Sequence, residues 1–263
     1  MTKSWADSEP PSNLLLANED PPPFAVTNRG GASPFLLIGD HAGRAIPGRL
    51  ESLGLKAEEL ETHIAWDIGV TGLGERLAWA LDACFIRQTY SRLVIDCNRR
   101  PADPTAIPEI SDGASIPGNV ELDAVSIAAR RREIYQPYQD AIAAELDRRS
   151  RFGRDTLLVS LHSFTPSLGG RERPWRMGVL HRNDSPFSAR FLTLLKRALG
   201  GAAGDNQPYR MDETDNTIPL HVDPRGLDYL ELEVRQDLIA DELGCVREAE
   251  LIAGSLQSAF GAD

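Results

Sequence analysis

Two short apolar runs in this chain each end at a histidine that opens a polar loop. Residues 35–39 (FLLIG) lead to Asp40 and His41, and residues 157–161 (LLVSL) lead to His162. Runs of this length, bounded by glycine or polar residues, are typical of buried strands in a parallel sheet. Ligands of open α/β sheets bind beyond the carboxyl ends of the strands, so we expect both imidazoles to converge on one point.

Elsewhere the chain alternates between strand-like and helix-like patterns. Further strands are expected at 84–88, 93–95, 177–180 and 228–234. Helices are expected at 57–64, 70–82, 122–149, 187–199 and 237–260. Pro137 is expected to kink or divide the long helical region, and residues 96–118 are expected to form a long loop. This alternation predicts an α/β fold with a mostly parallel central sheet and helices on both faces.

The amino-terminal segment differs in composition from the rest of the chain. Residues 1–34 are rich in proline, serine, asparagine and acidic groups, and we expect an extended N-terminal arm with little structure of its own. Residues 35–263 are expected to form a single α/β domain, because they contain no internal repeat and α/β folds of this length often form one domain. The hydrophobic share of 41% is close to that of an ordinary soluble globular protein.

Charge and composition exclude several classes of function. The formal net charge of −11 disfavours a nucleic-acid partner, which requires a positive surface. No apolar run approaches the roughly 18 residues of a membrane span, and no basic-then-apolar start indicates a signal peptide. Three cysteines form no disulfide framework and suit a reducing compartment. We therefore expect a cytoplasmic protein with a small-molecule partner, and the sequence leaves a homo-oligomer open.

The paired histidines indicate a metal site. Imidazole is a common ligand of Zn²⁺, and a hydrolytic zinc has three protein ligands plus water. His41 and His162 supply two of them, and Asp67, before a glycine at an expected helix start, is the third candidate. Asp67 is equally suited to cap that helix. Asp40 is an alternative ligand, but it needs a bent loop because neighbouring strand residues point to opposite faces. Another divalent metal is an alternative to zinc.

A carboxylate near a strand end supplies a candidate general base. In the run 229–235 (YLELEVR), Glu231, Glu233 and Arg235 share one strand face. Glu233 lies nearer the carboxyl end, where it could take a proton from water beside a metal and pass it to a leaving amine. The alternative is a Glu–Arg ion pair on a solvated strand face.

Arginines in the expected loops suggest that the ligand carries a carboxylate. Arg92 and Arg99 flank the short expected strand at 93–95, and Arg173 lies in a glycine-rich segment. A guanidinium can bind a carboxylate through two hydrogen bonds, so these three are the candidate substrate anchors.

An ordered series of short segments resembles the N-formylglutamate amidohydrolase family. It runs from about residue 35 to 240 and covers most of the chain. The matching segments are 40–43 (DHAG), 46–47 (IP), 65–69 (AWDIG), 91–99 (SRLVIDCNR), 116–119 (IPGN), 161–166 (LHSFTP), 173–175 (RPW), 205–209 (DNQPY) and 233–238 (EVRQDL). Asn98 and Asn119 lie in these segments and are further candidates for substrate binding.

The resemblance implies a fold, a reaction and a set of roles. The fold would be phosphorylase/hydrolase-like, similar to zinc carboxypeptidases, and the reaction would convert N-formyl-L-glutamate to formate and glutamate, a late step of histidine breakdown. Metal would lie at His41 and His162, with the base at Glu233. Carboxypeptidases use a His-x-x-Glu pair, whereas Arg44 stands three residues after His41, so Asp67 replaces the missing ligand. The segment around His41 resembles a divergent branch of the family, whose members need not all act on formylglutamate.

These observations predict a metal-dependent amidohydrolase that cleaves an N-formyl or N-acyl amino acid, with N-formyl-L-glutamate as the favoured substrate. Two alternatives remain open. One is a non-catalytic protein that binds a small carboxylate. The other is an amidase or peptidase for another N-acyl amino acid.

Overall fold

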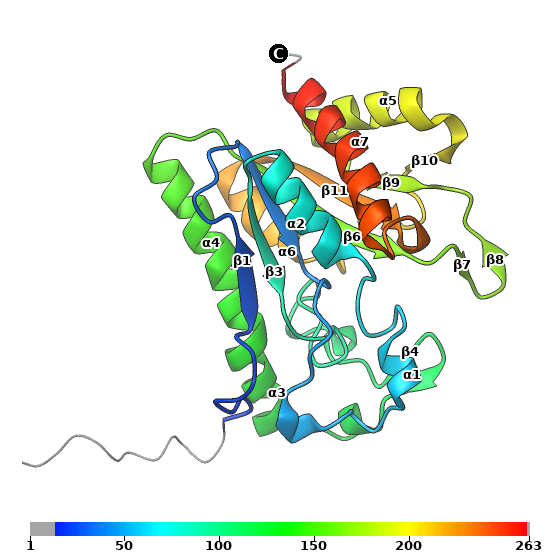
Figure 1. Cartoon of the computed structure of the whole chain (residues 1–263). Coiled ribbons are helices and arrows are strands. Elements are labelled where there is room, and N and C mark those ends of the chain that lie inside the picture. Colours follow the sequence, from blue (N-terminus) through cyan, green and yellow to red (C-terminus); the bar gives the residue numbers. More distant parts are fainter. Residues whose placement is uncertain (1–13, 262–263) are drawn as a thin grey trace, which may run out of the picture.

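A seven-stranded sheet forms the centre of the computed structural model, which describes residues 14–261 (Figure 1). Its strands are β1 (Phe24–Thr27), β2 (Phe35–Gly39), β3 (Cys84–Gln88), β6 (Leu157–Phe164), β9 (Met177–Leu180), β10 (Ala203–Asp205) and β11 (Asp228–Arg235). They lie in the order β1-β3-β2-β6-β11-β9-β10. Strands β3, β2, β6 and β11 are mutually parallel, whereas β1 and β9 are antiparallel to their neighbours β3 and β11. The predicted α/β fold with a mostly parallel sheet is confirmed.

Helices cover both faces of this sheet, as predicted. The α-helices of the described residues are α1 (Ala57–Leu60), α2 (Val70–Ala80), α3 (Ala124–Arg130), α4 (Gln136–Arg151), α5 (Pro186–Leu199), α6 (Thr217–Val222) and α7 (Glu242–Phe260). One apolar core lies between the sheet and α2, α5 and α7, and a second lies between the sheet and α3, α4 and α6. Figure 1 shows α2 and α7 on one side of the sheet and α4 on the other.

The two-residue period of β6 and β11 brings polar side chains to one end of the second core. In β11, Leu230 and Leu232 enter the first core, and Tyr229 enters the second. Glu231 and Glu233 therefore lie on the same face as Tyr229, closer to the carboxyl end of the strand. The register pairs Glu233 with His162 of β6, so both side chains reach the same edge of the sheet.

The segment at 93–95 is not the strand that its apolar residues predicted. A turn forms instead, in which the Val94 N–H donates to the Ser91 carbonyl. The Leu93 carbonyl accepts from Asn119 Nδ2 at 2.9 Å, and the Val94 carbonyl accepts from Arg130 Nη1 at 3.0 Å. Because side chains satisfy these buried carbonyls, the segment needs no neighbouring strand.

The expected N-terminal arm is wrong for residues 24–27, which form β1. Phe24 pairs with Gln88 and Thr27 with Phe85, so this segment is an edge strand of the main sheet. Further upstream, Glu133 accepts hydrogen bonds from the backbone N–H groups of Leu15 and Leu16. Residues 1–13 of the predicted arm lie outside the described residues.

The long helical region divides next to Pro137, as predicted. A π-helical turn at Arg131–Tyr135 joins α3 to α4, and Pro137 lies in the first turn of α4. Proline has no N–H to donate to the preceding turn, and a π-turn accommodates this gap without ending the helix. The closing helix begins at Glu242 rather than 237, because Gln236–Leu238 forms a 3-10 turn.

The expected loop at 96–118 contains regular structure. A hairpin of β4 (Ile110–Ser111) and β5 (Ala114–Ser115) lies within it, together with a 3-10 turn at Pro104–Ala106. A second small hairpin pairs β7 (Ser167–Leu168) with β8 (Arg171–Glu172). Both hairpins lie apart from the main sheet.

Candidate active site

A cavity of about 270 Å³ opens at the carboxyl ends of β2, β6 and β11. It contains both strand-end histidines and the glutamate that the sequence singled out as the base. Its lining residues are His41, His63, Asp67, Arg92, Asn98, Arg99, His162, Ser163, Phe164, Thr165, Leu180, Tyr209, Arg210, Asp212, Thr214, Asp215, Glu231 and Glu233. The prediction that the two imidazoles converge is therefore confirmed.

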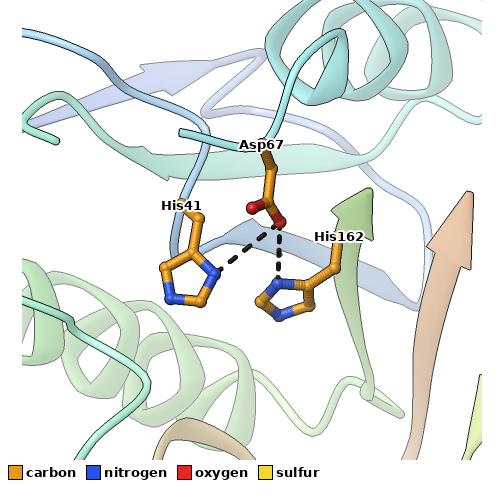
Figure 2. Close-up of side chains that lie close together, drawn as sticks. All are labelled: His41, Asp67 and His162. Carbon is orange, nitrogen blue, oxygen red and sulfur yellow. Dashed lines mark hydrogen bonds and ion pairs between the residues drawn. The ribbon is translucent and has the colours of Figure 1, made fainter. Parts of the chain in front are cut away.

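His41, Asp67 and His162 form the centre of this cavity (Figure 2). All three are buried, and one ligand atom from each lies within 4.8 Å of the others. Asp67 Oδ2 is 3.1 Å from His162 Nδ1 and 3.6 Å from His41 Nδ1. Two imidazoles and one carboxylate at this spacing can hold a metal ion.

The far nitrogen of each imidazole faces a group that orients the ring. His41 Nε2 lies 2.7 Å from Asp96 Oδ1. His162 Nε2 lies 3.1 Å from Ser160 Oγ and 3.6 Å from Asp40 Oδ2. In metal sites, a carboxylate or other acceptor commonly takes the second ring N–H and so fixes the tautomer of the ligand histidine. Here the same arrangement directs both Nδ1 atoms toward Asp67. Asp40 thus contacts His162 from behind.

The charge balance of the cluster suits a cation. Burial lowers the pKa of His162, but Asp40 and Asp67 outweigh burial and raise that pKa well above its usual value. Burial raises the pKa of Asp67, but His41 and His162 outweigh it and hold that pKa below its usual range. His41 Nδ1 is also buried without a hydrogen-bond partner among the described residues. A divalent cation would satisfy that nitrogen and replace the protons that these carboxylates otherwise attract.

The structure favours Asp67 as a ligand over Asp67 as a helix cap. The residue at the amino-terminal cap of α2 is Gly69, and no side chain caps that helix. Asp67 Oδ2 instead accepts the Ser163 N–H at 3.1 Å and faces the two histidines. Its other oxygen, Oδ1, lies 3.6 Å from Arg92 Nη1.

Glu233 and Glu231 are buried carboxyl groups rather than members of a solvated strand face. Their exposed fractions are 6% and 3%, and Oε2 of each is buried without a hydrogen-bond partner in the described chain. Burial raises the pKa of Glu233 to about 7 and that of Glu231 to about 8. Arg235, the expected ion-pair partner, binds Asp237 instead. The alternative of a Glu–Arg pair on a solvated face is wrong.

Two of the three predicted arginine anchors line the cavity, and both already have partners. Arg92 lies 2.7 Å from Asp96 Oδ2, so it supports the carboxylate that orients His41. Arg99 Nη1 donates to the Asn98 carbonyl at 3.0 Å and lies 3.6 Å from Asp215.

Arg173 does not line the cavity but lies behind its wall. Its Nη1 donates to Thr165 Oγ1 at 3.1 Å and to the Tyr209 hydroxyl at 3.0 Å, and its guanidinium lies over the Tyr209 ring. Arg173 therefore positions two lining residues. The sequence could not show this, because Tyr209 is 36 residues away.

The two asparagines have structural partners. Asn98 lines the cavity, where its Oδ1 accepts the backbone N–H groups of Asn216 and Thr217. Asn119 lies outside the cavity, which corrects its expected role in substrate binding. Its amide nitrogen donates to two backbone carbonyls, and its oxygen accepts from Arg130 at 2.6 Å. These contacts hold the 93–95 turn in place.

Sequence reasoning missed several groups that face the cavity, among them Glu231, Tyr209 and Arg210. Glu231 carried a signal in its strand period, and Tyr209 lies in a matching family segment, but Arg210 carried no signal. Arg210 is exposed at the rim and makes no hydrogen bond or ion pair with any residue in the described part of the chain. Among the arginines that line the cavity, Arg210 is therefore the one whose guanidinium has no hydrogen-bond or ion-pair partner in the described chain.

Fold and site together define a class: an α/β protein with a buried His-Asp-His group that could bind a metal beside an unpaired glutamate. A profile of the N-formylglutamate amidohydrolase family matches residues 33–240. The chain belongs to this family, which confirms the resemblance seen in the short segments. A comparison with curated proteins finds no match.

Two solved structures are similar to this chain over most of its length. The gene product Atu2144 from Agrobacterium tumefaciens is 32% identical, with a TM-score of 0.91 over 94% of this chain and 98% of that one. The N-formylglutamate amidohydrolase from Ralstonia eutropha JMP134 is 19% identical, with a TM-score of 0.65 over 90% and 97% of the two chains. The latter shares the fold. The family makes this protein a hydrolase acting on amides, with a small-molecule substrate, and does not favour the non-catalytic alternative.

One further property concerns membranes. Among residues 14–261, no helix combines the length and the hydropathy that crossing a bilayer requires.

Proposed function

We propose that this protein is a metal-dependent amidohydrolase that cleaves an N-formyl or N-acyl amino acid. N-formyl-L-glutamate, the substrate that gives the family its name, is the first compound to test. One observation carries the proposal: His41 Nδ1, His162 Nδ1 and Asp67 Oδ2 gather in one buried cluster, in a cavity that also holds Glu233.

His41, Asp67 and His162 would hold the metal. Two imidazoles and one carboxylate suit Zn²⁺, and three protein ligands are typical of catalytic rather than structural zinc sites. When bound, the ion supplies Lewis-acid chemistry, which makes an amide carbonyl more electrophilic and a water more acidic. Arg92 and Asp96 stabilise this group from behind through the contacts with Asp67 and His41.

Glu233 would move the proton. Its carboxyl group faces the cavity without a hydrogen-bond partner in the described chain, so it can accept a proton from the attacking water. It can then deliver that proton to the departing amide nitrogen. The pairing of Glu233 with His162 in the register of β11 and β6 supports this role.

The arginines at the cavity would orient the substrate. Arg210 at the rim has no partner among residues 14–261, and Arg99 lies deeper, so a substrate carboxylate can form charge-assisted hydrogen bonds with either group. Fixing that remote carboxylate holds the scissile amide in one place relative to Glu233. An amidase or peptidase for another N-acyl amino acid would use the same groups, and a substrate panel separates the two.

Replacement of Glu233 tests the proposed reaction. We expect Glu233→Gln to lower kcat by about 10²–10⁴-fold, because the amide cannot accept the proton, while metal content stays unchanged. Turnover of N-formyl-L-glutamate and a panel of N-acyl amino acids by the zinc-loaded protein is the measurement. Glu58→Gln, an exposed change in α1, is the matched control and should keep wild-type turnover. Full turnover by the Glu233→Gln protein would contradict the assigned role.

A further inference from the structure

Glu231 is a buried carboxyl group for which the proposed reaction has no use. It lines the cavity, two residues before Glu233 on the same face of β11. Its exposed fraction is 3%, its Oε2 is buried, and it accepts no hydrogen bond from the described chain. A buried polar group without a partner destabilises a protein, so its presence in a cavity indicates that a ligand completes it.

The position of Glu231 is deep in the cavity. Along the sheet it pairs with Ser160 of β6 on one side and Leu180 of β9 on the other. Ser160 is itself in contact with the inner nitrogen of His162. Glu231 therefore forms part of the floor, below the level of Glu233 and the metal cluster.

The charges around this floor are mainly negative. Burial and three carboxyl groups, those of Asp215, Glu233 and Asp40, raise the pKa of Glu231, and His162 acts in the opposite direction. No arginine or lysine among the described residues forms an ion pair with it within 4 Å. The floor is consequently an acidic surface with unused acceptor capacity.

The arginines of the cavity lie elsewhere. Arg92 is held by Asp96 and Asp67, and Arg99 lies beside Asp215. Arg210, at the exposed rim, has no partner in the described chain. At the rim of the cavity, Arg210 can therefore bind a carboxylate of a ligand. At the floor, the carboxyl group of Glu231 can accept a hydrogen bond from a donor of the ligand.

We propose that Glu231 binds a cationic side chain of the substrate, an ammonium or guanidinium group, and so selects N-acyl derivatives of basic amino acids. This inference rests on the proposed function, since it names the substrate class of the same site. The substrate's own carboxylate would meet Arg210, and its basic side chain would reach the floor. A bound ammonium or guanidinium would favour the ionised form of Glu231, whereas a glutamate side chain would bring a further carboxylate beside Glu231 and Asp215 and so disfavour ionisation of all three groups.

Binding of free amino acids, the product class of the proposed reaction, tests this selection without requiring turnover. Calorimetry on the full-length zinc-loaded protein would compare L-lysine, L-glutamate and L-norleucine, the last of which lacks the ammonium group. We expect L-lysine to bind about tenfold or more tighter than either of the others, because a charged hydrogen bond to a buried group is worth that much. Glu231→Gln should remove the preference, and the exposed Glu58→Gln control should retain it.

Two further measurements keep the test sharp. Glu231→Asp retains the charge and should keep part of the lysine preference, and an unfolding curve of each variant shows that it folds. Equal binding of lysine and glutamate to wild-type protein, or a preference that survives Glu231→Gln, would overturn the proposal. A second bound equivalent of zinc that disappears in Glu231→Gln would also overturn it, because the floor would then be a cation site.

The same variants separate this proposal from the proposed hydrolysis. A lysine preference that is lost in Glu231→Gln, with no cleavage of Nα-formyl-L-lysine or any other N-acyl amino acid, supports recognition by Glu231 and refutes the reaction. Cleavage of N-formyl-L-glutamate that is at least as fast as that of Nα-formyl-L-lysine supports the reaction and refutes the role of Glu231.

Discussion

The two ends of strand β2 differ in whether the buried polar side chains beside them have hydrogen-bond partners. At its start, Arg149 of α4 is completely buried, and it donates to the carbonyls of Ser33, Pro34 and Phe35 and to Glu145. At its end, His41 lines a cavity where His41 Nδ1, Glu231 Oε2 and Glu233 Oε2 are buried without a hydrogen-bond partner among residues 14–261. Groups that serve stability are satisfied within the fold, whereas groups that serve a ligand are left incomplete until it binds.

Both ends use residues that are rarely buried, so burial alone does not separate them. Arg149 is fixed by Glu145 four residues earlier on the same helix and by backbone that precedes β2. Glu231 and Glu233 each have a buried Oε2 atom that accepts no hydrogen bond from the described residues. The two ends differ in whether their buried polar atoms have hydrogen-bond partners within the described chain. Substituting one buried side chain at a time tests this difference.

The largest change in stability should follow loss of Arg149. We expect Arg149→Met to lower the free energy of unfolding by about 3–5 kcal/mol, because it leaves the carbonyls of Ser33, Pro34 and Phe35 without this donor and removes the more buried of the two arginines that bind Glu145. Urea denaturation measures this. Arg148→Met is the matched control: Arg148 also binds Glu145 but is one-third exposed, so its loss should lower stability by about 0–1 kcal/mol. Equal effects of the two substitutions would contradict the comparison.

A smaller, pH-dependent effect is expected from His221, a buried histidine of α6 that lies 2.7 Å from Gln139. Burial, together with Arg225, lowers the pKa of His221 to about 4. The unfolded chain therefore takes up the proton first as pH falls below about 6.5, so this contribution to stability is complete at neutral pH and declines toward pH 4. The loss amounts to about 2 kcal/mol at pH 5.

Urea denaturation at pH 7 and pH 5 isolates this effect when His221→Asn is compared with the wild type. The variant should lose less stability on acidification, by about 2 kcal/mol, because Asn does not titrate. Carboxyl groups elsewhere affect both proteins alike. An identical loss in the two proteins would show that His221 has an ordinary pKa when folded.

Much of the fold was accessible from the sequence because local periodicity decides it. The apolar runs before His41 and His162 mark parallel strands, and the two-residue period of β11 places both glutamates on one face. The 93–95 turn was missed because its three apolar residues are buried without strand pairing, through side chains of Asn119 and Arg130 that come from distant parts of the chain. Segment β1 was missed because its four residues (FAVT) lie between proline-rich and glycine-rich stretches that are typical of a loop.

The residues of the candidate site also differ in how far the sequence could predict them. Strand ends and the matching family segments pointed to His41, His162, Asp67 and Glu233, which the structure brings together. Which arginine is unpaired could not be predicted, because that depends on Asp96 and Asp215 meeting Arg92 and Arg99 across the fold. From the sequence alone, Glu231 could equally have been exposed to solvent. Its burial depends on the neighbouring strands, which the strand pattern of its own segment does not show. Completeness of hydrogen bonding is a tertiary property, so sequence patterns do not report it.

The most direct test of the proposed metal site, at the carboxyl end of β2, is the metal content of the purified protein and its histidine variants. We predict about one equivalent of zinc or another divalent metal in the wild type, and its loss in both His41→Ala and His162→Ala. His181→Ala, which removes a histidine paired with Asp205 away from the cavity, should retain the metal. Folded wild-type protein that binds no added zinc, or His41→Ala and His162→Ala proteins that bind as much as the wild type, would contradict the proposed metal site.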